Sequence, residues 1–311
     1  MARTTRRELL QAALAAAAAG PLAAAASSAS PSNATTGARA MPAQKPVQPS
    51  ARMPVLFVSH GSPMIAIEDS RFARGLDALG RDLPRPRAIL SVSAHWYVAG
   101  TQTTAAAHPG TIHDFGGFPE PLYRIEYPAP GDPALARRAA GLLAAQGATP
   151  TEDWGLDHGT WTALLHLFPE ADVPVVQLSI DGRLAPAAHL AMGRALAPLR
   201  DEGVLIMGSG GMTHNLRHAF NAMRTGDATT PAWATAFDAE VTRAVERHDE
   251  PALCRALEGE AGRLAHPTPD HYLPLLYAAG AAGAAAPGDA IAFPVTGFDL
   301  GSLSMRSVRW G

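Results

Sequence analysis

The chain has 311 residues, a formal net charge of −3 and no dense run of Lys or Arg after its first residues. This argues against a nucleic-acid-binding surface and favours a small-molecule substrate. Hydrophobic residues make up 47% and charged residues 17%, which is typical of a compact folded domain rather than a disordered chain. The one cysteine, Cys254, excludes an internal disulfide and a cysteine-based zinc site, so a tight metal site would need His, Asp or Glu ligands. No pattern in the sequence indicates an oligomeric state.

The first 52 residues differ in composition from the rest of the chain. Arg6 and Arg7 precede an Ala-rich apolar run at 12–26 and a Ser-rich stretch, which is the layout of a twin-arginine signal peptide. Because Gly20 and Pro21 interrupt the run, a permanent membrane span is the weaker interpretation, and a disordered leader with chance arginines is the other alternative. We expect a signal peptide at 1–30, a flexible linker at 31–52 and one catalytic domain at 53–311, exported to the periplasm and free of the membrane after the signal is removed.

From Pro54 onward, short apolar runs alternate with helical patterns. The apolar runs predict strands at 55–58, 88–93, 173–180 and 204–207. The helical patterns predict helices at 133–146, 185–200 and 231–247. Strands that alternate with helices indicate a single three-layer α/β/α domain with a largely parallel or mixed central sheet.

Three histidines, His60, His95 and His214, each follow a predicted strand within a few residues. Because the carboxyl ends of parallel strands share one edge of the sheet, where open α/β folds bind ligands, these side chains are expected to converge there. Neutral imidazoles suit Zn(II) and Fe(II), so the sequence favours a metal site at this edge. A capping or core role is the alternative for any one of them.

Two further histidines compete for a place in the site. Pro269 and Asp270 look like the start of a helix with His271 in its first turn, whereas His266 lies in the preceding extended segment. The residues alone leave these two equally favoured.

His158 lies in a loop rich in Gly and aromatic residues, where it would contact the substrate or donate a proton. The alternative is a structural loop in which Asp157 caps a helix that begins near Gly159. His108 and His113 belong to a long Gly/Pro-rich segment that we expect to cover the pocket. The Gly208–Gly211 run, read as a loop, allows the backbone to approach a ligand or turns the chain.

Motifs of other chemistries are absent. The chain has no G-x-S-x-G elbow, no phosphate-binding loop and no H-E-x-x-H sequence. Six segments in order along the chain resemble those of a known family. They are Ser59-His60-Gly61-Ser62-Pro63, Ser93-Ala94-His95-Trp96, 115–131, Asp157-His158-Gly159, Thr213-His214-Asn215-Leu216 and 269–274. Together they are similar to the class III extradiol ring-cleaving dioxygenases, in the DOPA 4,5-dioxygenase-like branch of the protocatechuate 4,5-dioxygenase (LigB) superfamily.

The resemblance implies that His60, His95 and His271 are metal ligands and that His214 is a fourth ligand, an acid/base or both. The implied substrates are a small aromatic diol and O2, with Fe(II) as the cofactor. His214, with a pKa near the working pH, would take a proton from the catechol, and His158 would position the substrate or pass protons on. In the wider superfamily the third ligand is a glutamate; the histidine here also suits Zn(II).

Two rival functions follow from the same residues. A zinc-dependent hydrolase would use the histidines to activate water. A periplasmic metal carrier is less favoured, because carriers usually have His-rich or Met-rich flexible tracts and these histidines are dispersed along the chain.

Overall fold

The computed structural model describes residues 52–283 and 290–311, so the predicted signal peptide and nearly all of the predicted linker lie outside the described residues. Within these ranges eight strands form one mixed sheet in the order β4-β3-β5-β2-β6-β1-β10-β7. Their bounds are β1 Val55–Ser59, β2 Ala88–Val98, β3 Gln102–Thr104, β4 Thr149–Thr151, β5 Val175–Asp181, β6 Val204–Gly210, β7 Ile291–Ala292 and β10 Val308–Trp310. A separate hairpin pairs β8, Phe298–Asp299, with β9, Leu303–Ser304.

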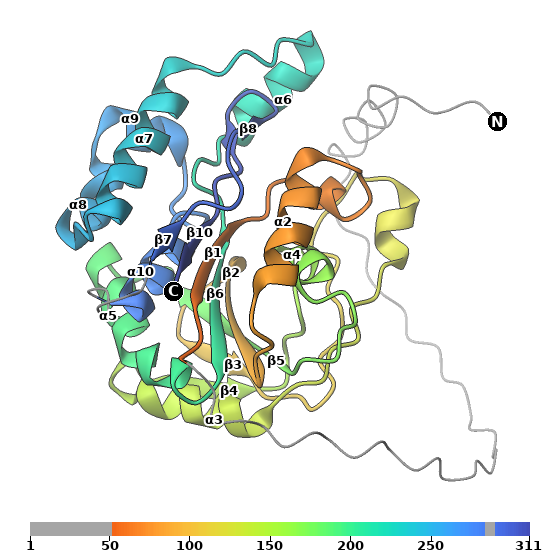
Figure 1. Ribbon diagram of the computed structural model, residues 1–311, viewed down its shortest axis with the longest axis vertical. Helices are drawn as coiled ribbons and strands as arrows, with labels where there is room; N and C mark the ends of the chain where they lie inside the picture. The colour runs from red at the N-terminus through yellow and green to blue at the C-terminus, as the bar shows by residue number, and fades with distance from the viewer. Residues whose placement is uncertain (1–51, 284–289) are drawn as a thin grey trace.

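Helices cover both faces of the sheet (Figure 1). Their bounds are α2 Arg71–Asp82, α3 Pro133–Leu142, α4 His158–Leu167, α5 Pro186–Leu196, α6 Leu216–Thr225, α7 Ala232–Glu246, α8 Glu250–Arg255, α9 Glu260–Ala265 and α10 Leu273–Ala282. Short 3-10 turns lie at Pro63–Ala66, Glu120–Arg124, Ala144–Gln146, Ala197–Arg200 and Ala256–Glu258. Across the described ranges, no helix combines the length and the apolar character that a membrane crossing requires.

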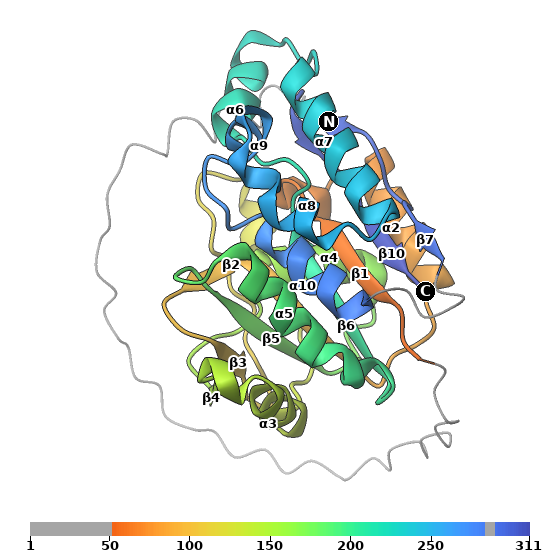
Figure 2. The ribbon, with the colours of Figure 1, turned by 90° about the vertical axis from the view of Figure 1, so that its left-hand side faces the viewer.

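The alternation of side chains along each strand divides the core into two halves. In β1, Val55 and Phe57 belong to the half of the core that also contains residues of α3, α5, α7 and α10, whereas Leu56 and Val58 belong to the half that contains residues of α2 and α4. Of the first group of helices, α5 and α10 lie in front of the central strands when the molecule is turned (Figure 2). Both faces of the central strands are therefore buried, which explains why their sequences are continuously apolar.

The predicted three-layer fold with a mixed sheet is confirmed. The four central strands β5, β2, β6 and β1 run parallel, and antiparallel pairs join β3 to β5 and β10 to β1. The parallel strands end at one edge, where α6 and the β8–β9 hairpin also lie (Figure 1).

Three local predictions were wrong. His95 lies inside β2 rather than after it, because the strand continues past an irregularity and pairs Tyr97 with Ile180. The glycine run is strand up to Gly210, because β6 stays paired with β1 as far as Ser59. His271 precedes α10, whose first residue is Leu273; the chain makes a turn there, with the Tyr272 N–H donating to Pro269 O.

Candidate metal centre

Five histidines from five separate segments line one cavity of about 380 Å³. The segments belong to the loop after β1, the far part of β2, the first residue of α4, the β6–α6 connection and the turn before α10. In that order, the histidines are His60, His95, His158, His214 and His271. The fold thus brings together all of the histidines that the sequence and the resemblance placed in the site.

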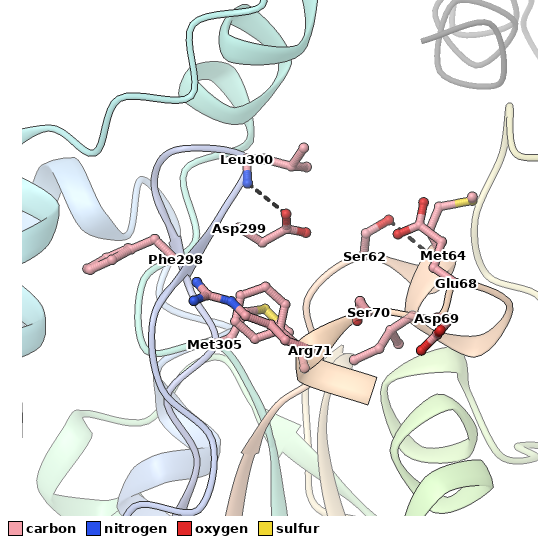
Figure 3. Close-up of a pocket in the computed structure, with 12 residues that line it drawn as sticks. Ser62, Met64, Glu68, Asp69, Ser70, Arg71, Phe298, Asp299, Leu300 and Met305 are labelled. Atoms are coloured by element: carbon pink, nitrogen blue, oxygen red, sulfur yellow. Dashed lines mark hydrogen bonds between the residues drawn. The ribbon is translucent and has the colours of Figure 1, made fainter. Parts of the chain in front are cut away.

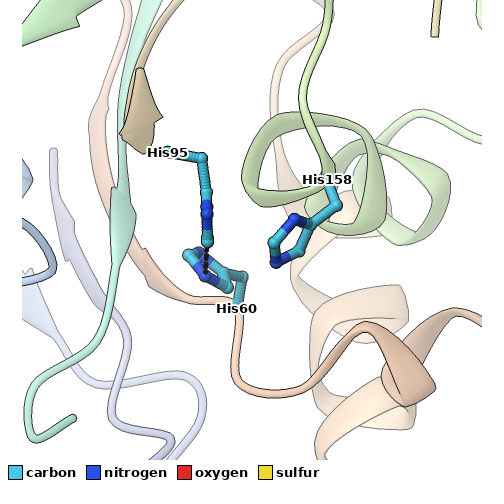
Figure 4. Close-up of side chains that lie close together, drawn as sticks. All are labelled: His60, His95 and His158. Atoms are coloured by element: carbon cyan, nitrogen blue, oxygen red, sulfur yellow. Dashed lines mark hydrogen bonds between the residues drawn. The ribbon is translucent and has the colours of Figure 1, made fainter. Parts of the chain in front are cut away.

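The imidazole of His60 is held on one side by Ser209 of the neighbouring strand. His60 Nδ1 lies 3.0 Å from Ser209 Oγ, and the Ser209 hydroxyl donates to Gly159 O at 2.5 Å. Because the hydroxyl proton is used on Gly159, the serine oxygen accepts the Nδ1 proton of His60. The Nε2 of His60 is then left with a lone pair, and it faces Nε2 of His95 at 3.0 Å (Figure 4).

Asp114 contacts two other histidines of the cavity. Its Oδ1 accepts from both the backbone N–H and Nδ1 of His158 at 2.9 Å, and its Oδ2 lies 3.3 Å from His95 Nδ1. The two rings lie close together, with centroids 3.8 Å apart. A carboxylate only accepts hydrogen bonds, so it favours a proton on Nδ1 of each ring and a free Nε2.

His271 follows the same pattern. Its Nδ1 donates to the carboxylate of Asp270, while its Nε2 is buried with no hydrogen-bond partner among the described residues. The ring lies parallel to that of His214, with centroids 3.4 Å apart, and its centroid is 5.0 Å from that of His95 and 5.3 Å from that of His60.

Burial favours the uncharged form of four of these imidazoles, those of His60, His95, His214 and His271. Burial, followed by the other histidines, lowers the pKa of His60 and of His271 well below the ordinary value. Burial lowers the pKa of His95 to about 3 and that of His214 to about 4. The expectation that the pKa of His214 lies near the working pH is therefore corrected, although a neutral His214 remains able to accept a proton.

These residues fit a metal ion. Neutral imidazoles whose outward nitrogens donate to a carboxylate or hydroxyl are the usual arrangement of metal-bound histidines. The 3.0 Å between the Nε2 atoms of His60 and His95 is also close to the spacing of two nitrogens that each lie ~2.1 Å from one ion. The orphaned Nε2 of His271 would gain a partner in the same way.

Two groups of possible ligands are close enough to share an ion. His60, His95 and His158 each place a ligand atom within 4.8 Å of the others, and so do His214, Asp270 and His271. The set implied by the resemblance takes members of both groups. Which of these nitrogens bind the metal stays a prediction.

Apolar side chains form much of the remaining wall. Phe115 and Phe118 come from the Gly/Pro-rich segment, and Leu216, Phe220 and Met223 come from α6. Leu216 and Phe220 are exposed, so they lie at the mouth of the cavity. The walls suit a flat aromatic molecule.

A larger cavity of about 610 Å³ adjoins the first one, and the two share Ser62 and Leu300 (Figure 3). No histidine lines it. Its charged residues are Glu68, Asp69, Arg71 and Asp299, and none of them lines the cavity that holds the histidines. The smaller cavity is therefore the candidate site.

The other histidines considered from the sequence lie elsewhere. His266 is buried behind the site, with Nε2 3.1 Å from Met212 O and its ring against Phe237. His113 Nε2 lies 3.0 Å from Ile125 O, and His108 is exposed. The segment that carries His108 and His113 does cover the pocket, but through Asp114, Phe115 and Phe118.

Sequence reasoning did not identify three partners of the histidines: Ser209, Asp114 and Asp270. Asp270 could have been found, because it is adjacent to His271. Asp157 caps α4 as expected, with its side chain accepting from Thr160 N, while the next residue, His158, faces the cavity. The expected cap is thus confirmed, whereas a role of His158 toward the substrate stays a prediction.

Comparisons with known proteins find clear relatives of this chain. Residues 54–295 match the family described as the catalytic LigB subunit of aromatic ring-opening dioxygenase. A 4,5-DOPA dioxygenase extradiol from Escherichia coli is 49% identical over 85% of this chain and 97% of its own length. An enzyme of the same name from Beta vulgaris is 41% identical over 73% of this chain and 86% of its own length.

A solved structure extends the comparison to the fold. The crystal structure of an uncharacterized protein from Escherichia coli K12 matches with a TM-score of 0.71 and 44% sequence identity. The match covers 84% of this chain and all of that one.

Proposed function

Because the chain belongs to the family of catalytic LigB subunits of aromatic ring-opening dioxygenases, we propose that it opens the ring of a catechol beside the two hydroxyl groups, with O2 as the second substrate. The observation that carries the proposal is the convergence of five histidines on one apolar-walled cavity. Both atoms of O2 enter the product, so the reaction takes no external reductant.

We propose His60, His95 and His271 as the ligands of the metal and Fe(II) as the metal. Each presents an Nε2 that is free of a proton if its Nδ1 donates as described above. When bound, Fe(II) supplies a path for electrons between the diol and O2, which Zn(II) does not.

The remaining histidines act on protons and on position. His214, neutral and stacked on His271, would accept a proton from one catechol hydroxyl and return it as the ring opens. His158, fixed by Asp114, would donate or accept a hydrogen bond at the other side of the bound diol. Phe115 and Phe118 would stack against the ring and exclude water.

Anaerobic reconstitution tests this function. The protein is loaded with Fe(II) or Zn(II), mixed with a set of catechols, and then exposed to air while O2 uptake and the yellow ring-fission product are followed. We expect uptake with Fe(II) and none with Zn(II). No O2 uptake with any catechol under Fe(II) would overturn the dioxygenase proposal, and hydrolysis that proceeds without O2 in the Zn(II) protein would favour the rival hydrolase.

We also propose that the chain is exported through the twin-arginine route, on the basis of Arg6, Arg7 and the apolar run that follows. Because this route carries folded proteins, it would suit an enzyme that takes up its metal before export. Replacing both arginines with Lys is expected to retain the full-length protein in the cytoplasm, measured by cell fractionation. An unchanged distribution would contradict this proposal.

A further inference from the structure

The carboxylate of Asp114 contacts a histidine with each of its oxygens. Oδ1 lies 2.9 Å from Nδ1 of His158, and Oδ2 lies 3.3 Å from Nδ1 of His95. We infer that Asp114 is a positioning residue, which holds both imidazoles with the proton on Nδ1 so that both Nε2 atoms face the metal and the substrate. This inference rests on the proposed function, because it assigns His95 to the metal and His158 to the substrate.

The backbone before Asp114 is anchored on both sides. Ile112 N donates to Leu156 O at 2.7 Å, and Trp161 Nε1 donates to Ile112 O at 2.9 Å. A Cβ at Gly155 would come within 2.1 Å of Gly110 O, so the absence of a side chain there lets the two segments approach closely. The position of Asp114 is therefore set by the body of the protein rather than by the histidines that it contacts.

Asp114 also belongs to the start of α4. The backbone N–H of His158, the first residue of this helix, donates to the same Oδ1 that accepts from the ring. The first N–H groups of a helix have no partner within it, and the positive end of the helix favours a carboxylate. Two bonds from one residue to one oxygen restrict the ring of His158 to a single orientation.

Without such a partner, a neutral histidine can carry its proton on either nitrogen, and a proton on Nε2 removes the lone pair that binds a metal. The Asp114 carboxylate thus fixes the tautomer of His95, the metal ligand, and of His158, the group that faces the substrate. The next residue, Phe115, lies on the apolar wall of the cavity and packs in a T-shaped arrangement with His158, with ring centroids 5.4 Å apart.

The first test is read on the wild-type protein, and variants serve only to assign its signals. Protein labelled with ¹⁵N in histidine is studied by long-range ¹H–¹⁵N NMR, both metal-free and loaded with Zn(II), with signals assigned from His95→Gln and His158→Gln. We expect the Nδ1–H tautomer for His95 and His158 in the metal-free protein and for His158 in the loaded protein. An Nε2–H tautomer for either ring in the metal-free protein would overturn the inference.

The second test uses Asp114→Asn, with Asp114→Glu for rescue. Loss of a group that orients metal ligands typically weakens metal binding by about 10–100-fold, so Asn should raise the Zn(II) dissociation constant by that factor and Glu should recover part of the loss. The control is Asp153→Asn, which alters an exposed carboxylate bonded to Thr151 on the loop before α4. A Zn(II) affinity of Asp114→Asn within about threefold of the control would contradict the inference.

The outcomes separate the two proposals, since tautomers and Zn(II) affinity are measured without catechol or O2. A protein that cleaves no catechol yet shows the expected tautomers would refute the proposed function and retain the role of Asp114.

Discussion

The ring of His60 and the hydroxyl of Ser209 meet across two parallel strands, with Nδ1 3.0 Å from Oγ. The register of β1 and β6 places Ser209 opposite Val58, two residues before the histidine. Because the Ser209 hydroxyl also donates to Gly159 O on α4, one side chain connects the sheet, the helix and the histidine.

Replacing Ser209 with Ala should therefore weaken metal binding. The Nδ1 proton of His60 would lose its acceptor, and the loss of such a partner typically reduces metal affinity by about 10-fold or more. Competition with a chelator measures the change. Ser91→Ala is the matched control, since Ser91 is a buried serine of β2 whose hydroxyl forms a hydrogen bond with Thr160 Oγ1. Equal affinities for the two variants would contradict the prediction.

His214→Ala separates an acid/base role from a ligand role. If His214 transfers protons only, kcat should fall by about 10²–10⁴-fold while the bound metal per chain stays near the wild-type value. His60→Ala provides the reference for a lost ligand, and metal analysis of both proteins is the measurement. Metal loss in His214→Ala as large as in His60→Ala would make His214 a ligand.

Gly210→Ala should displace His271. A Cβ at Gly210 would lie 2.2 Å from His271 O, so strand and turn would have to move apart, at a cost of about 1–3 kcal/mol in the free energy of unfolding. Metal affinity should fall as well. Gly141→Ala in α3 is the opposite case, because its Cβ meets nothing within 4 Å and the substitution should stabilise the helix by up to ~1 kcal/mol.

Urea unfolding of the two glycine variants tests this prediction. If Gly210→Ala were as stable as the wild type, the close approach of β6 to the turn before α10 would not constrain His271.

Asp157→Asn should change the pH dependence of stability. Burial, followed by the charge of Asp114, raises the pKa of Asp157 from 3.8 to about 6. Since the folded-state pKa is raised, the folded protein binds this proton more tightly than the unfolded chain does. This proton therefore contributes on the order of 3 kcal/mol to the free energy of unfolding. The contribution is fully present below pH ~4 and is lost as the pH rises to about 6.

The difference in unfolding free energy between wild type and Asp157→Asn isolates this group. The difference is measured by urea titration of metal-free protein between pH 4 and 7. As the pH rises, the wild type should lose stability relative to Asp157→Asn. A difference that is constant with pH would show that Asp157 ionises in the same range in the folded and unfolded states.

The fold was predictable because the burial of a strand determines which of its residues are apolar. Strands buried on both faces read as continuous apolar runs, and the central strands were found in this way. β3, β4 and β7–β10 were missed because each spans only two or three residues, too short for a periodic pattern. The ends of β2 and β6 were placed too early, since polar and glycine residues continue the pairing there.

The sequence by itself determined that His60, His95 and His214 lie near the carboxyl ends of core strands and that they would meet at one edge, because parallel strands end together. Tertiary structure alone decided how each ring is held. Ser209 is 149 residues from His60, and Asp114 is 44 residues from His158. No local pattern records such contacts: they depend on strand register and on the close approach of backbones, and these in turn decide which ring nitrogen is left free for a metal.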